Sequence, residues 1–259
     1  MIIQNIINTE IEYSKCFSKY YERKDDIRFV DEKMNDMYSH NFILLKNKLL
    51  GDDFYNFIVR EIEVHKNEYK EYLQIDSHYP FDLSLMDKFK YNFEVTSFDY
   101  YCIPVAKYDE LDNYSEYQLH KLYGQASEEE CLNLDLELNH TILGEEFTRR
   151  RFERRKEVYG KENGVQHFVC KKEEKYIGQA DYFTKDAYTK IEDFAVLDAY
   201  QRKGVGTYIL RKLLQKAFLS KEEYGYVLTF KDDPVCVMYK KCGFKYVGSR
   251  YSLFVDLNK

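Results

Sequence analysis

The chain has 259 residues, a length that suits two domains of about 100 to 150 residues better than one. Hydrophobic residues make up 44% and charged residues 32% of it, as in globular proteins, and no apolar run approaches the ~20 residues that a membrane-spanning helix needs. The six cysteines include no C-x-x-C pair and none has a histidine at metal-ligand spacing, so we expect neither a metal site nor disulfides. Residues 1–11 show no basic region ahead of an apolar stretch and no small-residue cleavage site, so we expect a cytoplasmic protein.

Charge is distributed unevenly along the chain. Residues 1–112 hold 14 Lys and Arg against 22 Asp and Glu (net −8), whereas residues 113–259 hold 25 against 23 (net +2). An acidic surface repels nucleic acid phosphates and attracts cations. We therefore expect no nucleic acid and no membrane as partner, and a cationic amine fits the charge better.

The first half predicts a small α+β domain. An amphipathic helix is expected over residues 53–69, a short strand over 72–75, a short helix over 83–90 and an aromatic-rich strand over 98–102. The best boundary lies at residues 109–113, which divides the chain into domains 1–112 and 113–259.

The second half gives a clearer pattern. A strand is expected over residues 118–122, helices over 127–138 and 145–159, and an antiparallel meander over 165–170, 176–183 and 190–197. An amphipathic helix follows Gly206, then a strand over 226–230, a short helix that begins at Asp233-Pro234 and ends at Gly243, and a last strand over 244–255. This order, β-α-α-β-β-β-α-β-α-β, predicts a mixed α/β fold with a mixed sheet flanked by helices.

The two halves share a weak internal similarity. With an offset of 151, residues 90–93 (KYNF) fall on residues 241–244 (KCGF), and an aromatic-rich strand follows both. Either the chain contains a diverged duplication, or two unrelated α+β domains use a common helix-strand junction.

A glycine-bearing turn joins the strand ending at Val196 to the following helix. Its residues are Gln201-Arg202-Lys203-Gly204-Val205-Gly206. A helix N-terminus offers unpaired backbone N–H groups and the positive end of the helix dipole, and glycines let phosphates approach the backbone. Arg202 and Lys203 add cationic donors. The turn therefore predicts a phosphate-binding site.

In this context the turn resembles the Q/R-x-x-G-x-G/A motif of the GNAT superfamily of N-acetyltransferases. Gln201, Gly204 and Gly206 match the motif itself, whereas a dinucleotide-binding site would need G-x-G-x-x-G and a later acidic residue. The resemblance implies a GNAT-like fold for residues 113–259 and acetyl-CoA as co-substrate. The residues it places at the coenzyme are Phe194, Ala195, Val196, Gln201, Arg202, Lys203, Gly204, Val205, Gly206 and Thr207.

A second segment, Tyr239-Lys240-Lys241-Cys242-Gly243-Phe244, resembles the Y-x-x-x-G-F element of the same family. The resemblance implies that Tyr239 protonates the departing thiolate, and the alternative is a tyrosine that packs beneath the sheet. The family often has asparagine seven residues before this tyrosine, where this chain has Asp232. An ionised carboxylate accepts but does not donate, which puts a coenzyme contact by Asp232 in doubt.

An amine attacks the thioester only as the free base, so a proton acceptor is needed. Glu192 and Asp193 precede the loop and are expected on opposite faces of their strand. Each is a candidate base, and for each the alternative is an ion pair with a neighbour such as Lys190. The resemblance implies that a backbone N–H near Val196 holds the thioester oxygen, without a covalent acyl-enzyme.

A dense basic run covers residues 149–156 (RRRFERRK). We favour a solvated helix face for it. The other possibilities are selection of an acidic group on the acceptor, docking of the acidic first domain and, least favoured, nucleic acid binding.

The sequence thus predicts an acetyl-CoA-dependent N-acetyltransferase, with a non-catalytic CoA-binding or acyl-CoA-sensing module as the alternative and a longer acyl or aminoacyl donor as a third possibility. The acceptor is a small amine or a peptide or protein N-terminus. In the first half, Gly51-Asp52-Asp53 and Lys88 stand where a second loop and tyrosine would be. Carboxylates there would repel a pyrophosphate, so we expect one coenzyme per chain, with the tandem halves in place of a dimer.

Overall fold

The computed structural model describes residues 2–161 and 164–258 of the chain. It divides into two compact units, each made of separate segments. Unit 1 comprises Met1–Phe17, Tyr101–Leu228 and Asp232–Val247, and unit 2 comprises Ser18–Tyr100, Thr229–Lys231 and Gly248–Lys259. Among the described residues, no helix combines the length and the apolar character that a bilayer crossing requires.

Unit 1 is built on a mixed sheet. Its strands β6 to β9 pair antiparallel with their neighbours, whereas β9 and β10 run parallel, and the end of β5 lies beyond β10. The strands are β5 (Phe93–Pro104), β6 (Tyr117–Lys121), β7 (Gln166–Lys172), β8 (Lys175–Lys185), β9 (Tyr188–Val196) and β10 (Tyr224–Phe230). The predicted meander and the order of elements after it are confirmed.

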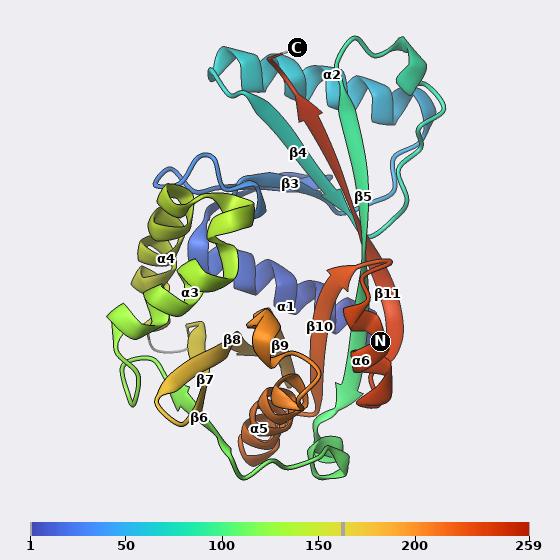
Figure 1. Cartoon of the computed structure of the whole chain (residues 1–259). Helices are drawn as coiled ribbons and strands as arrows, with labels where there is room; N and C mark the ends of the chain where they lie inside the picture. The colour runs from blue at the N-terminus through green and yellow to red at the C-terminus, as the bar shows by residue number, and fades with distance from the viewer. Residues whose placement is uncertain (1, 162–163, 259) are drawn as a thin grey trace. The chain divides into compact units, whose positions relative to one another are not determined.

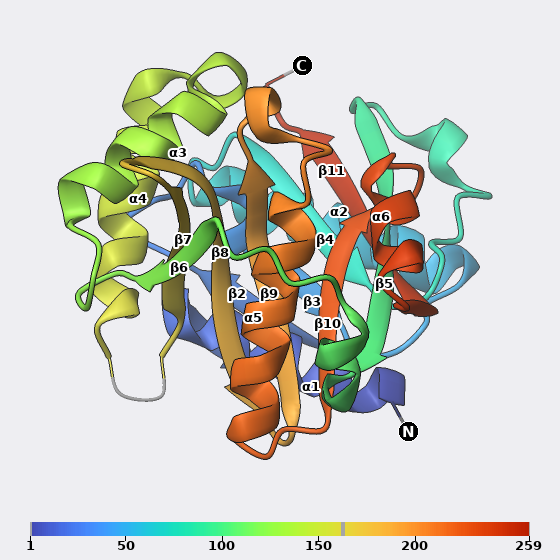
Figure 2. The same cartoon turned by 60° about the horizontal axis from the view of Figure 1, so that its bottom comes forward.

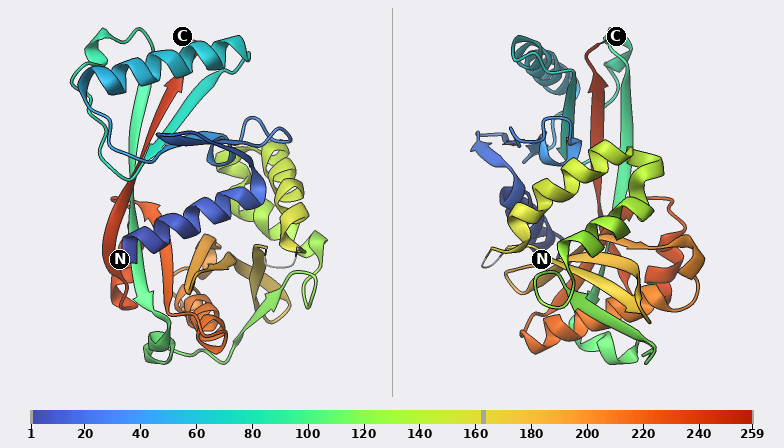
Figure 3. Two further views of the ribbon diagram at one scale, coloured as in Figure 1. Left: turned by 180° about the vertical axis from the view of Figure 1, so that it is seen from behind. Right: turned by 60° about the vertical axis from the view of Figure 1, so that its left-hand side comes forward.

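Helices cover both faces of this sheet. Alternate side chains of β8 face opposite ways: Gly178 lies against Ile209 of α5, whereas the ring of Phe183 lies 5.7 Å from that of Tyr13 on α1. Figure 2 shows α5 crossing β8 and β9, and both views in Figure 3 show α1 beside α4. The helices of unit 1 are α1 (Ile2–Phe17), α3 (Glu128–Leu143), α4 (Glu145–Tyr159), α5 (Val205–Leu219) and α6 (Val235–Lys241).

Local sequence explains where these helices begin. Ser127 and Glu130 form a reciprocal capping box at the start of α3, and the Asp233 carboxylate accepts a 2.8 Å hydrogen bond from the backbone N–H of Val235 at the start of α6. Helix α5 buries the apolar face that its spacing predicts, with no exposed area at Ile209, Leu210, Leu213, Leu214 and Ala217.

Unit 2 has a similar but smaller core. Its strands are β1 (Lys19–Glu22), β2 (Asp26–Val30), β3 (Phe42–Leu45), β4 (Tyr72–Ser77) and the end of β11 (Lys245–Asp256), in the order β1-β2-β3-β4-β11-β5. β3 and β4 pair in parallel, and β11 pairs antiparallel with β4. Helix α2 (Gly51–Asn67) packs on this sheet through Phe54 and Ile58. Figure 1 shows α2 beside β4 and β11.

The two halves of the chain repeat one order of elements. The sequence α1-β1-β2-β3-α2-β4-η2-β5 is matched by α4-β7-β8-β9-α5-β10-α6-β11, with a short 3-10 helix η2 (Met86–Lys88) in place of α6. In both, three antiparallel strands are followed by a helix and a parallel strand. The repeat agrees with a duplicated, GNAT-like fold.

Other details differ from the sequence prediction. The helix expected over residues 83–90 is wrong: η2 has three residues, because a segment of eight residues with one buried apolar side chain, Met86, is too short to nucleate an α-helix. Helix α1 and strands β1 to β3 were not predicted. The compact units are not the same as the segments 1–112 and 113–259, since α1 packs in unit 1 and the end of β11 in unit 2. The division of the sequence into those two segments stays a prediction.

Candidate active site

The glycine loop forms an open helix N-terminus in unit 1. Arg202 (φ 58°) and Gly204 (φ 84°) adopt left-handed backbone conformations, and α5 begins directly after Gly204. The first N–H to donate within the helix is that of Tyr208, to the Gly204 carbonyl at 2.9 Å. The preceding amides of α5 are therefore available to an anion.

Side chains of the loop prepare it for phosphate. Gln201 closes the loop, because its Nε2 donates to the Val196 carbonyl at 3.1 Å and to Oδ1 of Asp198 at 2.8 Å. Arg202 and Lys203 are exposed and form no ion pair with any residue in the described ranges. Their charges remain available to a ligand.

The two glycines have different roles. A Cβ at position 206 would lie 3.0 Å from Sδ of Met238 and 3.2 Å from Cζ of Phe194, so Gly206 lets α5 approach both α6 and β9. A Cβ at position 204 would clash with the ring of Tyr114, and the left-handed φ there also favours glycine. Tyr114, which the sequence did not single out, thus packs on the loop.

The tyrosine of the second motif is buried beside the loop. Helix α6 places the ring of Tyr239 6.3 Å from that of Phe194 and 5.7 Å from that of Phe244. Gly243 (φ 88°) is the left-handed residue that follows the C-cap of helix α6, as predicted. The Phe244 N–H donates to the Tyr239 carbonyl at 3.0 Å. Burial raises the pKa of the Tyr239 phenol well above its ordinary value, and the nearby Glu192 charge adds to this. The phenol is therefore protonated at neutral pH.

Strands β9 and β10 separate at this point. Among the described residues their parallel pairing covers only Tyr188–Lys190 with Tyr224–Tyr226. β9 continues to Val196 while pairing with β8 on its other edge. The β9 edge near Val196 that faces away from β8 is consequently left without a strand partner, as expected for backbone donors at an acyl group.

A β-bulge changes the directions of the two candidate bases. The β8–β9 register shifts between Gln179 and Asp181, and Asp193 has a left-handed φ of 50°. Asp181 is the cross-strand partner of Glu192, and Arg155 binds both Asp181 and Asp193. The expectation of opposite faces is therefore wrong: the extra residue of the bulge turns Asp193 to the face that carries Glu192.

Asp193 is part of a buried ionic cluster. Its carboxylate lies 2.7 Å from Arg155, 3.3 Å from Arg151 and 3.0 Å from Nε2 of Gln179. Burial alone would raise the pKa of Asp193, but the two guanidinium groups hold it well below its ordinary range. A carboxylate so held is a poor proton acceptor.

Glu192 is placed differently. Its side chain is 34% exposed, and its Oε2 lies 2.7 Å from Nζ of Lys190, the neighbour that the sequence suggested. Glu192 is also close enough to Tyr239 to influence its phenol. Of the two candidates, Glu192 alone combines access with proximity to Tyr239 among the residues described.

The basic run of α4 is only partly a solvated face. Arg149 is exposed and pairs with Glu145, but Arg151 and Arg155 are buried, and Arg154 donates to the Phe17 carbonyl. The favoured expectation is wrong for the buried pair, because Asp135, Asp181 and Asp193 neutralise these arginines at distances of 2.5 to 3.3 Å.

The remaining predicted residues lie at or near the loop. Ala195 and Val196 end β9, Val205 is buried, and Oγ1 of Thr207 lies 4.0 Å from Sγ of Cys242. Asp232 is exposed and makes no hydrogen bond or ion pair within the described part of the chain. The structure thus brings Gly206 of the loop and Tyr239 together at Phe194, and among the described residues it gives Asp232 no hydrogen bond or ion pair with either.

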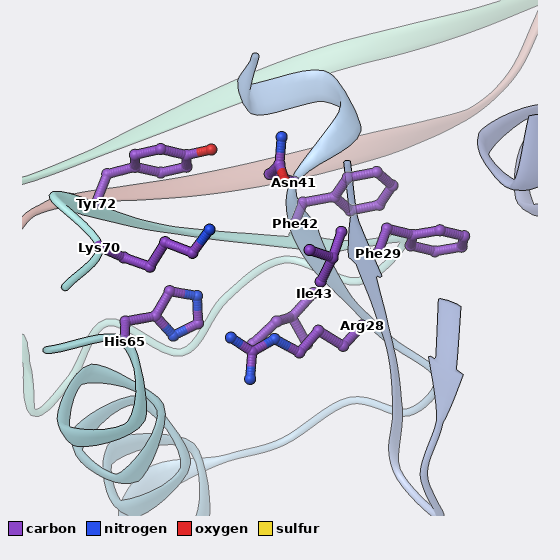
Figure 4. A pocket seen from close by; sticks show the side chains of 9 residues that line it. Arg28, Phe29, Asn41, Phe42, Ile43, His65, Lys70 and Tyr72 are labelled. Carbon is purple, nitrogen blue, oxygen red and sulfur yellow. The ribbon is translucent and has the colours of Figure 1, made fainter. Parts of the chain in front are cut away.

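Unit 2 contains a separate, small pocket of about 20 Å³ (Figure 4). Arg28, His65 and Lys70 point toward it from β2, the end of α2 and the turn between α2 and β4. Arg28 is already paired with Glu68 at 2.5 Å, and Lys70 with Oδ1 of Asn35 at 2.9 Å. The pocket lacks a helix N-terminus and is distinct in character from the loop of unit 1.

Together, a strand that leaves its parallel partner, a glycine turn and an open helix N-terminus form a site suited to an anionic ligand such as a phosphate. Comparison with known proteins agrees: residues 129–244 match the acetyltransferase (GNAT) family. The C-terminal part of the chain is therefore similar to GNAT acetyltransferases over these residues.

A curated relative supports this assignment. The "Uncharacterized N-acetyltransferase YjcF" of Bacillus subtilis (strain 168) is 33% identical over 89 residues, 34% of this chain and 62% of the relative. The chain thus matches less than two thirds of that protein's length.

Solved structures extend the likeness of fold to nearly the whole chain. A functionally unknown conserved protein from Staphylococcus epidermidis has a TM-score of 0.77 at 15% identity, covering 92% of this chain and 94% of its own. A GCN5-related N-acetyltransferase from Kribbella flavida has a TM-score of 0.66 at 10% identity, covering 97% and 94%.

Proposed function

We propose that the chain transfers an acetyl group from acetyl-CoA directly to a primary amine. One observation carries the proposal: Phe194 lies against both Gly206 and Tyr239, so the two halves of the coenzyme motif meet at one point. The amides at the start of α5, with Arg202 and Lys203, suit a pyrophosphate, and Tyr239 then lies at the thioester end.

The side chains divide the chemistry among them. Glu192 takes the proton of the attacking amine, and Tyr239 donates its proton to the departing thiolate. Backbone donors on the unpaired edge of β9 near Val196 hold the oxygen that gains charge. Asp193, committed to two arginines, keeps the bulge in place instead of acting as a base.

The first half binds no coenzyme in this proposal. At the start of α2, the Gly51 N–H already donates to Oδ2 of Asp82 at 2.8 Å. This carboxylate occupies the position that a phosphate would take, and Asp52 and Asp53 add negative charge in the first turn. We propose one coenzyme per chain, a small amine or a peptide N-terminus as acceptor, and the cytoplasm as the place of action.

A panel of amines tests the proposal. The full chain is incubated with acetyl-CoA and polyamines, amino acids, aminoglycosides or peptides, and free thiol is measured. At least one amine is expected to accelerate thiol release. Silence across the panel from a chain that binds acetyl-CoA would contradict the proposal and favour an acyl-CoA-sensing module.

A further inference from the structure

A buried lysine joins two carboxylates in unit 1. Nζ of Lys190 on β9 lies 2.5 Å from Oε1 of Glu10 on α1 and 2.7 Å from Oε2 of Glu192. The side chains of Lys190 and Glu10 are 3% and 6% exposed. A carboxylate from the first helix thus reaches, through one lysine, the carboxylate assigned as the base.

Glu10 is held firmly in this position. The hydroxyl of Tyr226 on β10 donates to the same Oε1 atom at 2.7 Å. Nζ of Lys190 also lies 4.9 Å from the ring centre of Tyr13, one turn after Glu10 on α1. Contacts from α1, β9 and β10 therefore fix Glu10 against Lys190.

The charge of Lys190 explains why two carboxylates, those of Glu10 and Glu192, lie against it. A buried ammonium needs a compensating anion, because an unpaired charge in the interior is strongly destabilising. Burial alone would lower the pKa of Lys190, but the carboxylates of Glu10 and Glu192 raise it, so the lysine stays charged. Two carboxylates sharing one ammonium leave one net negative charge.

That extra charge bears on Glu192. Were Lys190 paired with Glu192 alone, the whole charge of the ammonium would be balanced by that one carboxylate. Glu10 neutralises Lys190 from the other side, which frees Glu192 to accept a proton.

We propose that Glu10 is a positioning residue of the acyl-transfer site, which acts through Lys190 to keep Glu192 able to accept the proton of the amine. This inference rests on the proposed function. It also makes α1, an element of the first half, a required part of the catalytic unit.

Other charged or titratable groups surround Glu192, and a test must leave them in place. They are Glu10 and Tyr13 on α1, Arg155 on α4, Asp181 on β8, Lys190 and Asp193 on β9, Tyr226 on β10 and Tyr239 on α6. Glu10→Gln removes one charge from this set with little change in volume.

The test is the pH profile of kcat/KM for acetyl transfer, with Glu12→Gln as control. Glu12 lies on the same helix but pairs with Lys15 near the surface. In Glu10→Gln we expect the acid limb to move about one pH unit lower, because a negative charge near Glu192 is lost. We expect turnover on the plateau to fall about tenfold, because the base is weaker. Glu12→Gln should keep the profile of the wild type.

If thermal melts show that Glu10→Gln does not fold, a second variant takes its place. Glu10→Asp keeps the charge but withdraws it from Lys190, and should move the acid limb in the same direction by a smaller amount. If the wild type turns over and the folded variants keep its acid limb, this inference alone is overturned. If the wild type releases no thiol with any amine, the proposed function fails and this inference fails with it.

Discussion

Phe194 on β9 and Tyr239 on α6 face each other with ring centroids 6.3 Å apart. These residues are 45 positions apart in the sequence and belong to separate motifs, and their contact joins the phosphate loop to the proposed acid. Gly206 lies against the same phenylalanine. In the proposed function, this contact sets the thioester end of the coenzyme relative to its pyrophosphate.

Gly204→Ala should abolish tight coenzyme binding. A methyl group there would clash with the Tyr114 ring and strain a backbone with φ of 84°. We expect the affinity for acetyl-CoA, measured by calorimetry, to fall at least about tenfold. The loop would have to move away from the Tyr114 ring to make room for the methyl group. Gly160→Ala is the matched control, since its Cβ would meet Tyr123 at an ordinary 3.7 Å. Unchanged affinity in Gly204→Ala would contradict the loop assignment.

Calorimetric titration should give one acetyl-CoA per chain. The anion position at the start of α2 is filled by Asp82, whose pKa is lowered first by the Gly51 N–H and then by Ser84. Removing the cations in Arg202→Ala or Lys203→Ala should weaken the single site about tenfold. Two equivalents per wild-type chain would show that the first half also binds.

The two acids of β9 should respond oppositely to amide substitution. Glu192→Gln should reduce turnover about 100-fold or more, the usual contribution of a general base, with little change in stability. Asp193→Asn should destabilise the fold by about 3 kcal/mol, because the carboxylate shared by the buried Arg151 and Arg155 is lost and each keeps only one acidic partner, Asp135 or Asp181. Urea unfolding and steady-state kinetics separate the effects, and the reverse pattern would make Asp193 the base.

Stability should fall on acidification through Asp193. Its pKa is depressed in the folded chain, because the two arginines outweigh the opposing effect of burial. A depressed carboxyl stabilises the fold fully above its unfolded value of about 4, and that contribution is lost as the pH falls through the folded value. Urea midpoints between about pH 5 and pH 2 should therefore drop more steeply in the wild type than in Asp193→Asn.

The C-terminal fold could be predicted because its local signals agree with its packing. The apolar face of α5, the Asp233-Pro234 start of α6 and the stop at Gly243 each have a local physical cause. The two motifs could also be found in the sequence in the expected order, but the contact between Phe194 and Tyr239 was not predicted and is seen only in the structure.

The directions of the site side chains could not be read in the same way. The bulge at Asp193 depends on pairing with β8, which places Arg155 between Asp181 and Asp193 across three elements. A signal for Glu10 did exist: it is a lone acid on the apolar face formed by Ile6, Tyr13 and Phe17. What no local pattern reveals is that its partner is Lys190, 180 residues away.

The most direct test of the central claim compares Tyr239→Phe with the wild type in two assays, acetyl-CoA binding by calorimetry and thiol release with an accepted amine. The substitution keeps the ring against Phe194 and removes only the hydroxyl. We predict unchanged acetyl-CoA binding and turnover reduced about 100-fold or more, because the departing thiolate no longer receives a proton from Tyr239. Turnover equal to that of the wild type would contradict the role of Tyr239 as the acid and, with it, this account of the site.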